Sequence, residues 1–248
     1  MRKIVSLFVL AAVLAGGRPA FAASSGEGAP FASSDDFGAW MTAYYRSPEP
    51  ARVGPAAVYF CDTLGGVKMT SRMAVAAFFA GIFRKDPATM RETYRLAASG
   101  SEDLKMFLSN AIWLADTPEA RGLLESASRE WTAAPLPEIL GREIQAPPKD
   151  ILTAPLSPPI LDMLWANFSA TGDPAPVLRV IKAGELKENA KGGDLATADS
   201  AIYSLGSNIK QHDKVREICE QEFAKATGFR KIMLGRVLDG TWISDTGK

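Results

Sequence analysis

Apolar residues recur every three or four positions along most of the chain, and this is the spacing of one face of an α-helix. The clearest stripe runs through Leu195, Ala198, Ile202, Leu205 and Ile209. No segment alternates apolar and polar residues between turn signals, as a half-buried strand would. The pattern therefore predicts an all-α protein, with about ten helices joined by short turns.

Capping residues indicate where several of these helices begin. Three sites place a side-chain acceptor directly before a proline: Asp86-Pro87, Thr117-Pro118 and Asp173-Pro174. The acceptor can take a backbone N–H of the first turn, and proline suits the first helical position because its missing N–H would have no partner there. Asp35 or Asp36 is expected to cap the first helix in the same way.

The helices are expected to pair as antiparallel hairpins, because the turns between them are short. Residues 78–97 (FFAGIFRKDPATMRETYRLA) are similar to residues 164–183 (LWANFSATGDPAPVLRVIKA) in their order of aromatic helix, Asp-Pro turn and apolar helix. Such internal similarity is typical of stacked helical repeats and favours a short, irregular α-solenoid. A non-repeating helical bundle would contain the same helices and is the alternative.

The first residues, 1–22, have the features of a bacterial export signal. Arg2 and Lys3 precede an uncharged apolar stretch, and Ala20-Phe21-Ala22 has the small residues of a signal-peptidase site. No later segment approaches the roughly 18 consecutive apolar residues of a membrane span, and the longest, Met73–Phe83, fits a buried core helix. The sequence thus predicts a periplasmic or secreted protein without a transmembrane anchor.

Composition divides the mature chain into four parts. Residues 23–33 are small and polar and are expected to form a flexible lead-in. Helical hairpins are predicted in residues 34–134 and 160–248. Between them, residues 135–159 contain seven prolines, which exclude a continuous helix. This proline-rich segment is either a hinge or a strap packed across the helices, and its apolar content favours the strap.

The charge of the mature chain is nearly balanced. Removing residues 1–22 takes away Arg2, Lys3 and Arg18 and no acid, so 28 basic side chains become 25, against 28 acidic ones. Tight binding to a phosphate backbone needs an excess of Lys and Arg. We therefore expect no nucleic-acid partner.

Cys61 and Cys219 are the two cysteines of the chain. An even number of cysteines in an oxidising compartment indicates a disulfide, which would join these two residues. Each cysteine also lies on the apolar face of its predicted helix, where it could be a separate buried thiol. Both alternatives stay open, because the sequence does not give the distance between the two helices.

Large aromatic residues gather in the first predicted helix, as Trp40, Tyr44 and Tyr45. Such rings either pack between helices as ordinary core or line a groove for a peptide, since aromatic residues supply much of the energy of protein interfaces. A stack of helices offers an extended concave surface for such a groove. These three residues are therefore the candidate partner-binding aromatics.

Candidate catalytic residues are few. His212 is the single histidine, which excludes a metal site built on paired histidines, and it is expected on an exposed turn. Ser207 and Lys210 match a serine–lysine nucleophile pattern whose companion motifs are missing. Glu217 and Glu220 lie among basic residues, as on a solvated helix face. We therefore expect no catalysis of its own, no metal and no cofactor.

Several segments of the chain carry a family resemblance. They are LDMLWANFSATGDPAPVLRVI (161–181) and AIYSLGSNIKQHDKVREICEQEF (201–223), with AVYFCDTLGG and FFAGIFRKDP upstream. In these segments the chain resembles a family of uncharacterised exported bacterial proteins built from helices. The resemblance implies a helical fold and an exported location, and it implies no particular activity.

Together these features predict an exported helical protein that binds a protein or peptide partner in the cell envelope. A small-ligand or lipid-binding protein of the periplasm, with its pocket near the proline-rich segment, is the second hypothesis. A hydrolytic enzyme is the third. It would need a cleft in which acidic, serine or lysine side chains from distant segments meet.

Overall fold

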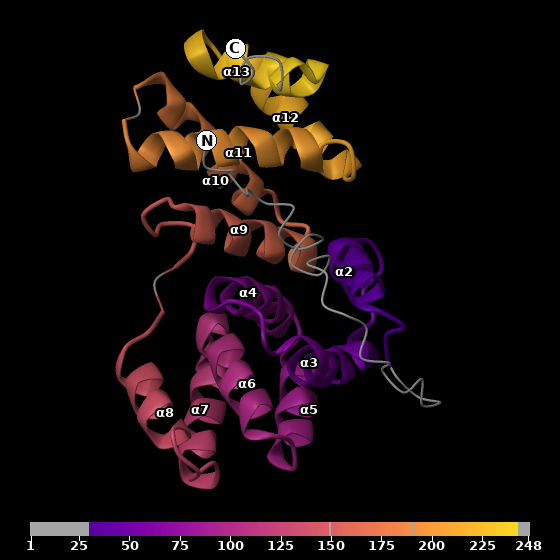
Figure 1. Ribbon diagram of the computed structural model, residues 1–248, viewed down its shortest axis with the longest axis vertical. Helices are drawn as coiled ribbons and strands as arrows, with labels where there is room; N and C mark the ends of the chain where they lie inside the picture. The colour runs from indigo at the N-terminus through magenta and orange to yellow at the C-terminus, as the bar shows by residue number, and fades with distance from the viewer. Residues whose placement is uncertain (1–29, 149, 190, 243–248) are drawn as a thin grey trace.

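The computed structural model describes residues 30–148, 150–189 and 191–242, and these residues form helices and turns without a strand (Figure 1). The all-α class predicted from the apolar spacing is therefore confirmed. The predicted export signal at residues 1–22 lies outside the described residues. None of the described helices has the length and apolar character that a membrane span requires.

The helices fall into two consecutive groups, before and after the proline-rich segment. The first group comprises α2 (Ser34–Ala43), the 3-10 turn η1 (Tyr44–Arg46), α3 (Pro50–Leu64), α4 (Met69–Lys85), α5 (Pro87–Ala98), α6 (Glu102–Ala115), α7 (Pro118–Glu130) and α8 (Leu136–Gln145). The second comprises α9 (Pro158–Thr171), α10 (Pro174–Glu185), the 3-10 turn η2 (Leu186–Glu188), α11 (Gly193–Asn208), α12 (Asp213–Lys225) and α13 (Gly228–Asp239).

Side-chain caps begin α5 and α7 at the predicted residues. The Asp86 carboxylate accepts the backbone N–H of Ala88 and of Thr89, both at 3.1 Å, and Thr117 accepts that of Ala120 at 3.1 Å. The Thr89 hydroxyl also donates to Asp86, and this bond leads the effects that lower the pKa of Asp86. Because each cap satisfies an N–H that the helix itself cannot pair, the breaks between helices are encoded locally.

Two caps differ from the prediction. The first helix is capped by Ser33, whose hydroxyl accepts the N–H of Asp36, so neither Asp35 nor Asp36 is the cap. The Asp173 side chain makes no capping bond and instead pairs with Lys85 at 3.0 Å. At the first helix several acceptors stand close together, and the path of the backbone selects Ser33 among them. At α10 the Asp173 carboxylate is engaged by Lys85, which belongs to the first group of helices.

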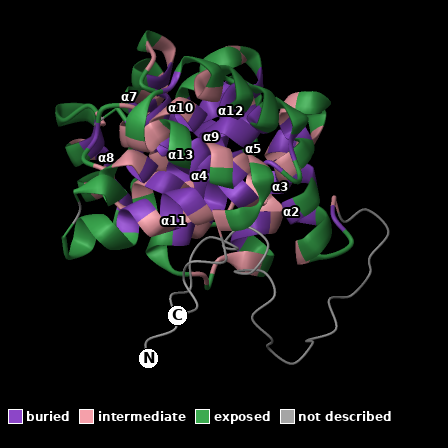
Figure 2. Cartoon of the chain, turned by 90° about the horizontal axis from the view of Figure 1, so that it is seen from above, coloured by how far each residue is buried: buried purple, intermediate pink, exposed green. Residues whose placement is uncertain are grey.

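The most extensive contact between helices joins α4 to α9, which lie side by side at the centre of the molecule (Figure 1). Residues 74–83 of α4 are all buried, as expected for a helix that is apolar on every side. Gly81 allows the close approach, since a Cβ there would lie 2.9 Å from the Cβ of Ala170. Buried residues accordingly concentrate on these two helices in Figure 2.

Helices that follow one another in sequence also contact one another, from α4 to α8 and again from α9 to α13. These contacts are those of helical hairpins. The contacts of α4 with α9 and of α2 with α9, however, join parts of the chain that are far apart in sequence. A simple stack in which each repeat touches only its neighbours does not supply such contacts.

The last residues of the expected flexible lead-in are packed into the core. Phe31 is only 2% exposed, and its ring centroid lies 5.3 Å from those of Trp40 and Tyr59. The Arg52 guanidinium lies 4.4 Å from the centroid of the Phe31 ring. Burial of this ring and its contacts with neighbouring rings offset part of the conformational entropy that is lost when these residues are ordered.

The proline-rich segment, residues 135–159, is packed against the helices along much of its length. It includes the short helix α8, whose Leu136 and Leu140 are fully buried. Farther along, Ile151 is buried, and Arg179 donates to the carbonyl oxygen of Ala154 at 2.9 Å. These contacts favour a strap over a hinge, and the strap stays a prediction.

Candidate functional site

Two of the three candidate partner-binding aromatics, Trp40 and Tyr44, lie in the core. Trp40 is 6% and Tyr44 is 5% exposed, and both rings meet the ring of Phe78 edge to face, at centroid distances of 5.4 and 5.5 Å. Burial raises the pKa of the Tyr44 phenol to about 12, with smaller effects from the acidic residues nearby. Of the three candidate partner-binding aromatics, Tyr45 alone is partly exposed.

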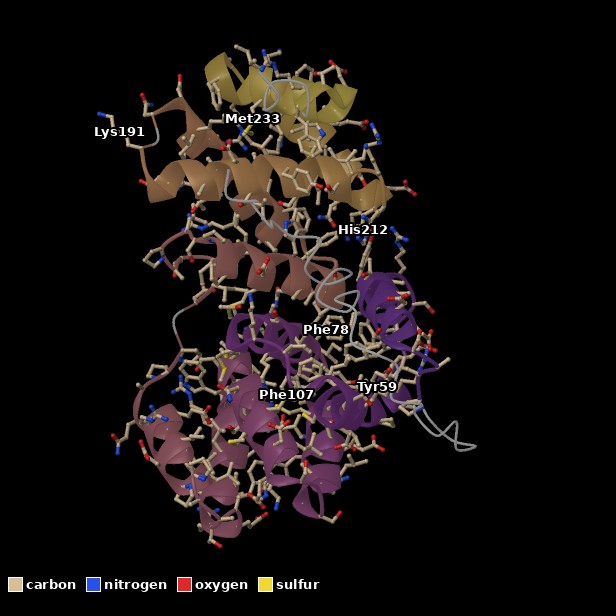
Figure 3. The ribbon with its side chains drawn as sticks, in the orientation of Figure 1. Tyr59, Phe78, Phe107, Lys191, His212 and Met233 are labelled. Atoms are coloured by element: carbon tan, nitrogen blue, oxygen red, sulfur yellow. The ribbon has the colours of Figure 1, made fainter. Side chains whose placement is uncertain are left out.

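Tyr45 belongs to a polar contact between the first and the second group of helices. The Tyr45 hydroxyl oxygen lies 3.2 Å from Nδ1 of His212, and a guanidinium nitrogen of Arg46 lies at the same distance from that atom. The Arg46 guanidinium also donates to the carbonyl oxygen of Gln211. Figure 3 shows His212 where the C-terminal helices meet α2. The cluster fastens η1 to the start of α12.

His212 is only 1% exposed, so the expected exposed turn histidine is wrong. Because a guanidinium has only donors, Nδ1 must accept, which requires a neutral imidazole with its proton on Nε2. The pKa of His212 is lowered from 6.5 to about 4, mainly by burial and also by the charge of Arg46, whereas Asp213 acts in the opposite direction. His212 is therefore a structural acceptor at neutral pH.

Gly172 provides the space in which the Tyr45 ring lies. Its φ of +65° is in the left-handed region, and a Cβ there would lie 2.8 Å from a ring carbon of Tyr45. We expect Gly172→Ala to lower the free energy of unfolding by about 2 kcal/mol, through backbone strain and displacement of the ring. Urea unfolding followed by circular dichroism would measure this loss.

The matched substitution is Gly122→Ala in α7, where a Cβ meets nothing within 4 Å. We expect this change to leave stability unaltered or to raise it, since alanine is the better helix former. Equal losses from the two substitutions would contradict the role assigned to Gly172.

Both cysteines are free thiols in the structure, and both are buried. Cys61 lies on α3 and Cys219 on α12, in different groups of helices. Burial is the main cause that raises the pKa of each thiol to about 12. A thiol with so high a pKa forms little thiolate, so neither is suited to nucleophilic chemistry.

An apolar groove lies between α4, α6 and α8, and we call it the methionine groove. It has a volume of about 350 Å³ and is lined mainly by Val67, Met69, Met73, Met106, Phe107 and Ile139. Met69 is 69% exposed, the largest exposure of any large apolar side chain in the described residues. Phe107, which forms part of the groove, is labelled in Figure 3. Sequence reasoning missed this site because its residues come from three separate helices.

The polar residues of the methionine groove already have partners within the protein. Arg72 forms a two-bond ion pair with Asp103, at 2.8 and 3.2 Å, and also donates to the carbonyl oxygen of Gly65. The Asn110 amide donates to the carbonyl oxygen of Met106. Since these groups are satisfied, the surface that the groove offers to an occupant is chiefly apolar.

Two further hollows lie beside the proline-rich segment, and Asp116 and Pro148 line both of them. The larger, of about 350 Å³, lies between α4, α9 and the residues Pro148, Asp150 and Ile151, and includes the buried Asn167. The smaller, of about 220 Å³, lies between α6, α7 and α8 and includes Glu143. Burial raises the pKa of Glu143 from 4.5 to about 7, although Ser109 and Arg142 act to lower it.

The remaining residues considered for chemistry are not brought into these sites. Ser207 and Lys210 stand at the end of α11, and Glu217 and Glu220 are exposed on α12. Within the described part of the chain, no three His, Cys, Asp or Glu side chains gather as a metal site would require. The methionine groove and the two hollows are thus the surfaces with the strongest claim to a function.

Comparisons with known proteins find no match to this chain among family models, curated proteins or solved structures. Its function is therefore inferred from the geometry of the groove and the hollows.

Proposed function

We propose that this protein is exported to the bacterial cell envelope and binds an apolar segment of a partner protein in the methionine groove. The observation that carries the proposal is Met69, a large apolar side chain that is 69% exposed at the edge of an apolar groove. The Met69 side chain is continuous with the apolar lining of the groove, and a contiguous apolar surface of this kind is typical of an interaction site. Export is supported by the signal features of residues 1–22.

The side chains of the groove suit a partner with apolar side chains of varied shape. Methionine has three rotatable bonds and a polarisable sulfur, so three methionines can adjust their packing to different side chains. The apolar face of an amphipathic helix is the usual occupant of such a groove. The paired Arg72 and Asp103 at its border can orient the polar residues of the partner without leaving a buried charge unpaired.

A protein partner fits the groove better than a lipid or another small apolar molecule. A small-molecule site encloses most of the surface of its ligand. The methionine groove is open at Met69, so a ligand confined to it would remain partly exposed to water. We further propose that the helical hairpins form an irregular stack, which would keep α4, α6 and α8 rigid enough to present the groove.

The proposal predicts that a photo-crosslinking amino acid at position 69 captures a specific protein in the envelope of the native host. Crosslinking from position 232 should not capture it, because Ile232 is similarly exposed, at 58%, but lies on α13, outside the groove. The captured segment should then bind the purified protein, and Met69→Glu should weaken that binding about tenfold, which corresponds to the loss of one apolar contact.

The matched control for binding is Ile232→Glu, which should leave the affinity unchanged. Both positions are exposed, so neither substitution should alter folding by more than about 0.5 kcal/mol. The proposal fails if both variants bind the segment equally well. It also fails if the molecule crosslinked from position 69 is a lipid.

A further inference from the structure

The smaller hollow, between α6, α7 and α8, contains a buried acid with an unused oxygen. Glu143 is 9% exposed, and its Oε1 accepts a bond of 3.4 Å from the Ser109 hydroxyl. Its Oε2 is buried and has no hydrogen-bond partner. Such an oxygen costs folding free energy unless something else provides the missing donor.

The hollow has more acidic than basic side chains in its lining, which favours a bound cation. Among the described residues Arg121 is the one basic side chain that lines it, and it is already paired with Asp116 at 2.8 Å. The other two acids of the lining, Glu125 and Glu143, form no ion pair with any described residue. Arg142 precedes Glu143 in sequence and is exposed, and it forms no ion pair with that carboxylate among the described residues.

The rest of the lining is apolar and includes an aromatic ring in a fixed position. Ile112 and Leu124 are buried side chains of the wall. Trp113 also lines the hollow, and its indole N–H donates to the carbonyl oxygen of Ala146 at 2.8 Å. A carboxylate beside an indole ring is a favourable environment for an ammonium group, which is attracted to both.

We propose that this hollow binds an organic ammonium ion with a short apolar chain, held by a charge-assisted hydrogen bond to Glu143. The apolar chain would lie against Ile112, Trp113 and Leu124. The volume of about 220 Å³ equals that of about seven water molecules, so the ligand is small. A bound ammonium group supplies the donor that Oε2 lacks.

This site is separate from the methionine groove, and the residues that line the two are different. Loss of partner binding at Met69 would therefore leave the ammonium site intact, and the reverse also holds. The larger hollow, which shares Asp116 and Pro148 with this one, could extend the site for a longer ligand.

Calorimetric titration of the full chain with n-hexylammonium tests the proposal. At pH 8 the ligand is charged, because alkyl amines have a pKa of about 10.4, and Glu143, with a pKa of about 7, is mostly ionised. We expect saturable binding of one n-hexylammonium and at least about tenfold weaker binding of hexan-1-ol. Glu143→Gln should weaken the binding of n-hexylammonium about tenfold, as loss of a charged hydrogen bond predicts.

Two further variants separate the role of the charge from a loss of folding. Glu138 lies on the same helix, is exposed and does not line the hollow. The Glu138→Gln variant should therefore bind n-hexylammonium as the wild type does. Ala120→Leu keeps every charge but enlarges a side chain in the wall of the hollow, and it should weaken binding. Because Ala120 is also buried in the core, circular dichroism must first show that this variant is folded. The proposal is overturned if n-hexylammonium does not bind, if hexan-1-ol binds equally well, or if Glu143→Gln leaves the affinity unchanged.

A peptide lysine could supply the same chemistry as a free amine. The amide of Nα-acetyl-lysine carries an alkylammonium group next to a peptide backbone. Titration of the protein with this compound therefore distinguishes a peptide lysine from a free amine. Binding of both ligands would assign the site to exposed lysine side chains as well as to free amines. Binding of n-hexylammonium alone would assign it to free amines.

Discussion

Replacing Phe78 by alanine should lower the free energy of unfolding by about 3–5 kcal/mol, the usual cost of removing a fully buried phenylalanine ring. Phe78 is 0% exposed at the centre of α4. Its ring touches those of Trp40 and Tyr44 from α2 and η1, and its centroid lies 5.6 Å from that of Phe79. Deleting it leaves a cavity between α4 and the rings of Trp40 and Tyr44; Phe78 is labelled in Figure 3.

Urea unfolding monitored by circular dichroism and by tryptophan fluorescence would measure this loss. Met69→Ala is the matched control, because Met69 lies on the same helix but is 69% exposed, and its loss should cost less than about 0.5 kcal/mol. A cost below about 1 kcal/mol for Phe78→Ala would show that the aromatic residues of α2 do not depend on this ring.

Acidification should weaken the protein through His212. Its pKa is about 4 in the folded chain and 6.5 ordinarily, so between these values the unfolded chain binds more protons than the folded one. The stability due to the neutral imidazole is complete above pH 6.5 and is lost as the pH falls through about 4. At about 1.4 kcal/mol per pKa unit, the loss amounts to about 3 kcal/mol. At 1% exposure, solvent screens the group little.

Comparison with His212→Asn isolates this contribution, because the asparagine amide oxygen can accept from Arg46 and does not titrate. The difference in unfolding free energy between wild type and variant should change by about 3 kcal/mol between pH 7 and pH 3.5. Glu143 and Asp162 have pKa values raised to about 7 by burial and act in the opposite direction. Because the wild type and His212→Asn both contain these two acids, their contributions cancel in the difference between the two unfolding free energies. Parallel pH curves would contradict the assigned role of His212.

The positions of most helices could be predicted because their signals are local. Asp86, Ser101 and Thr117 cap α5, α6 and α7 through bonds to residues two or three positions ahead. The apolar run Met73–Phe83 also predicts a helix buried on all sides, which α4 is. Export, the pairing of hairpins as a stack and the type of partner remain predictions, since they depend on more than local pattern.

The surroundings of single side chains could not be predicted in the same way. His212 follows polar residues and precedes a charged helix, so its neighbours in sequence indicate an exposed turn. It is buried because η1, whose Tyr45 lies 167 residues away in sequence, covers it. Likewise, Trp40 and Tyr44 have the helical spacing of either core or groove residues, and only the position of α4 decides between them.

The sequence by itself determined the all-α class, the ends of most helices and the chemistry available to the chain, because apolar spacing and capping act between residues a few positions apart. The tertiary structure decided which side chains are buried and which surfaces are hollow. The methionine groove and the Glu143 hollow each draw residues from three helices. Such sites depend on how the helices pack together, and that packing arises from contacts between residues far apart in the chain.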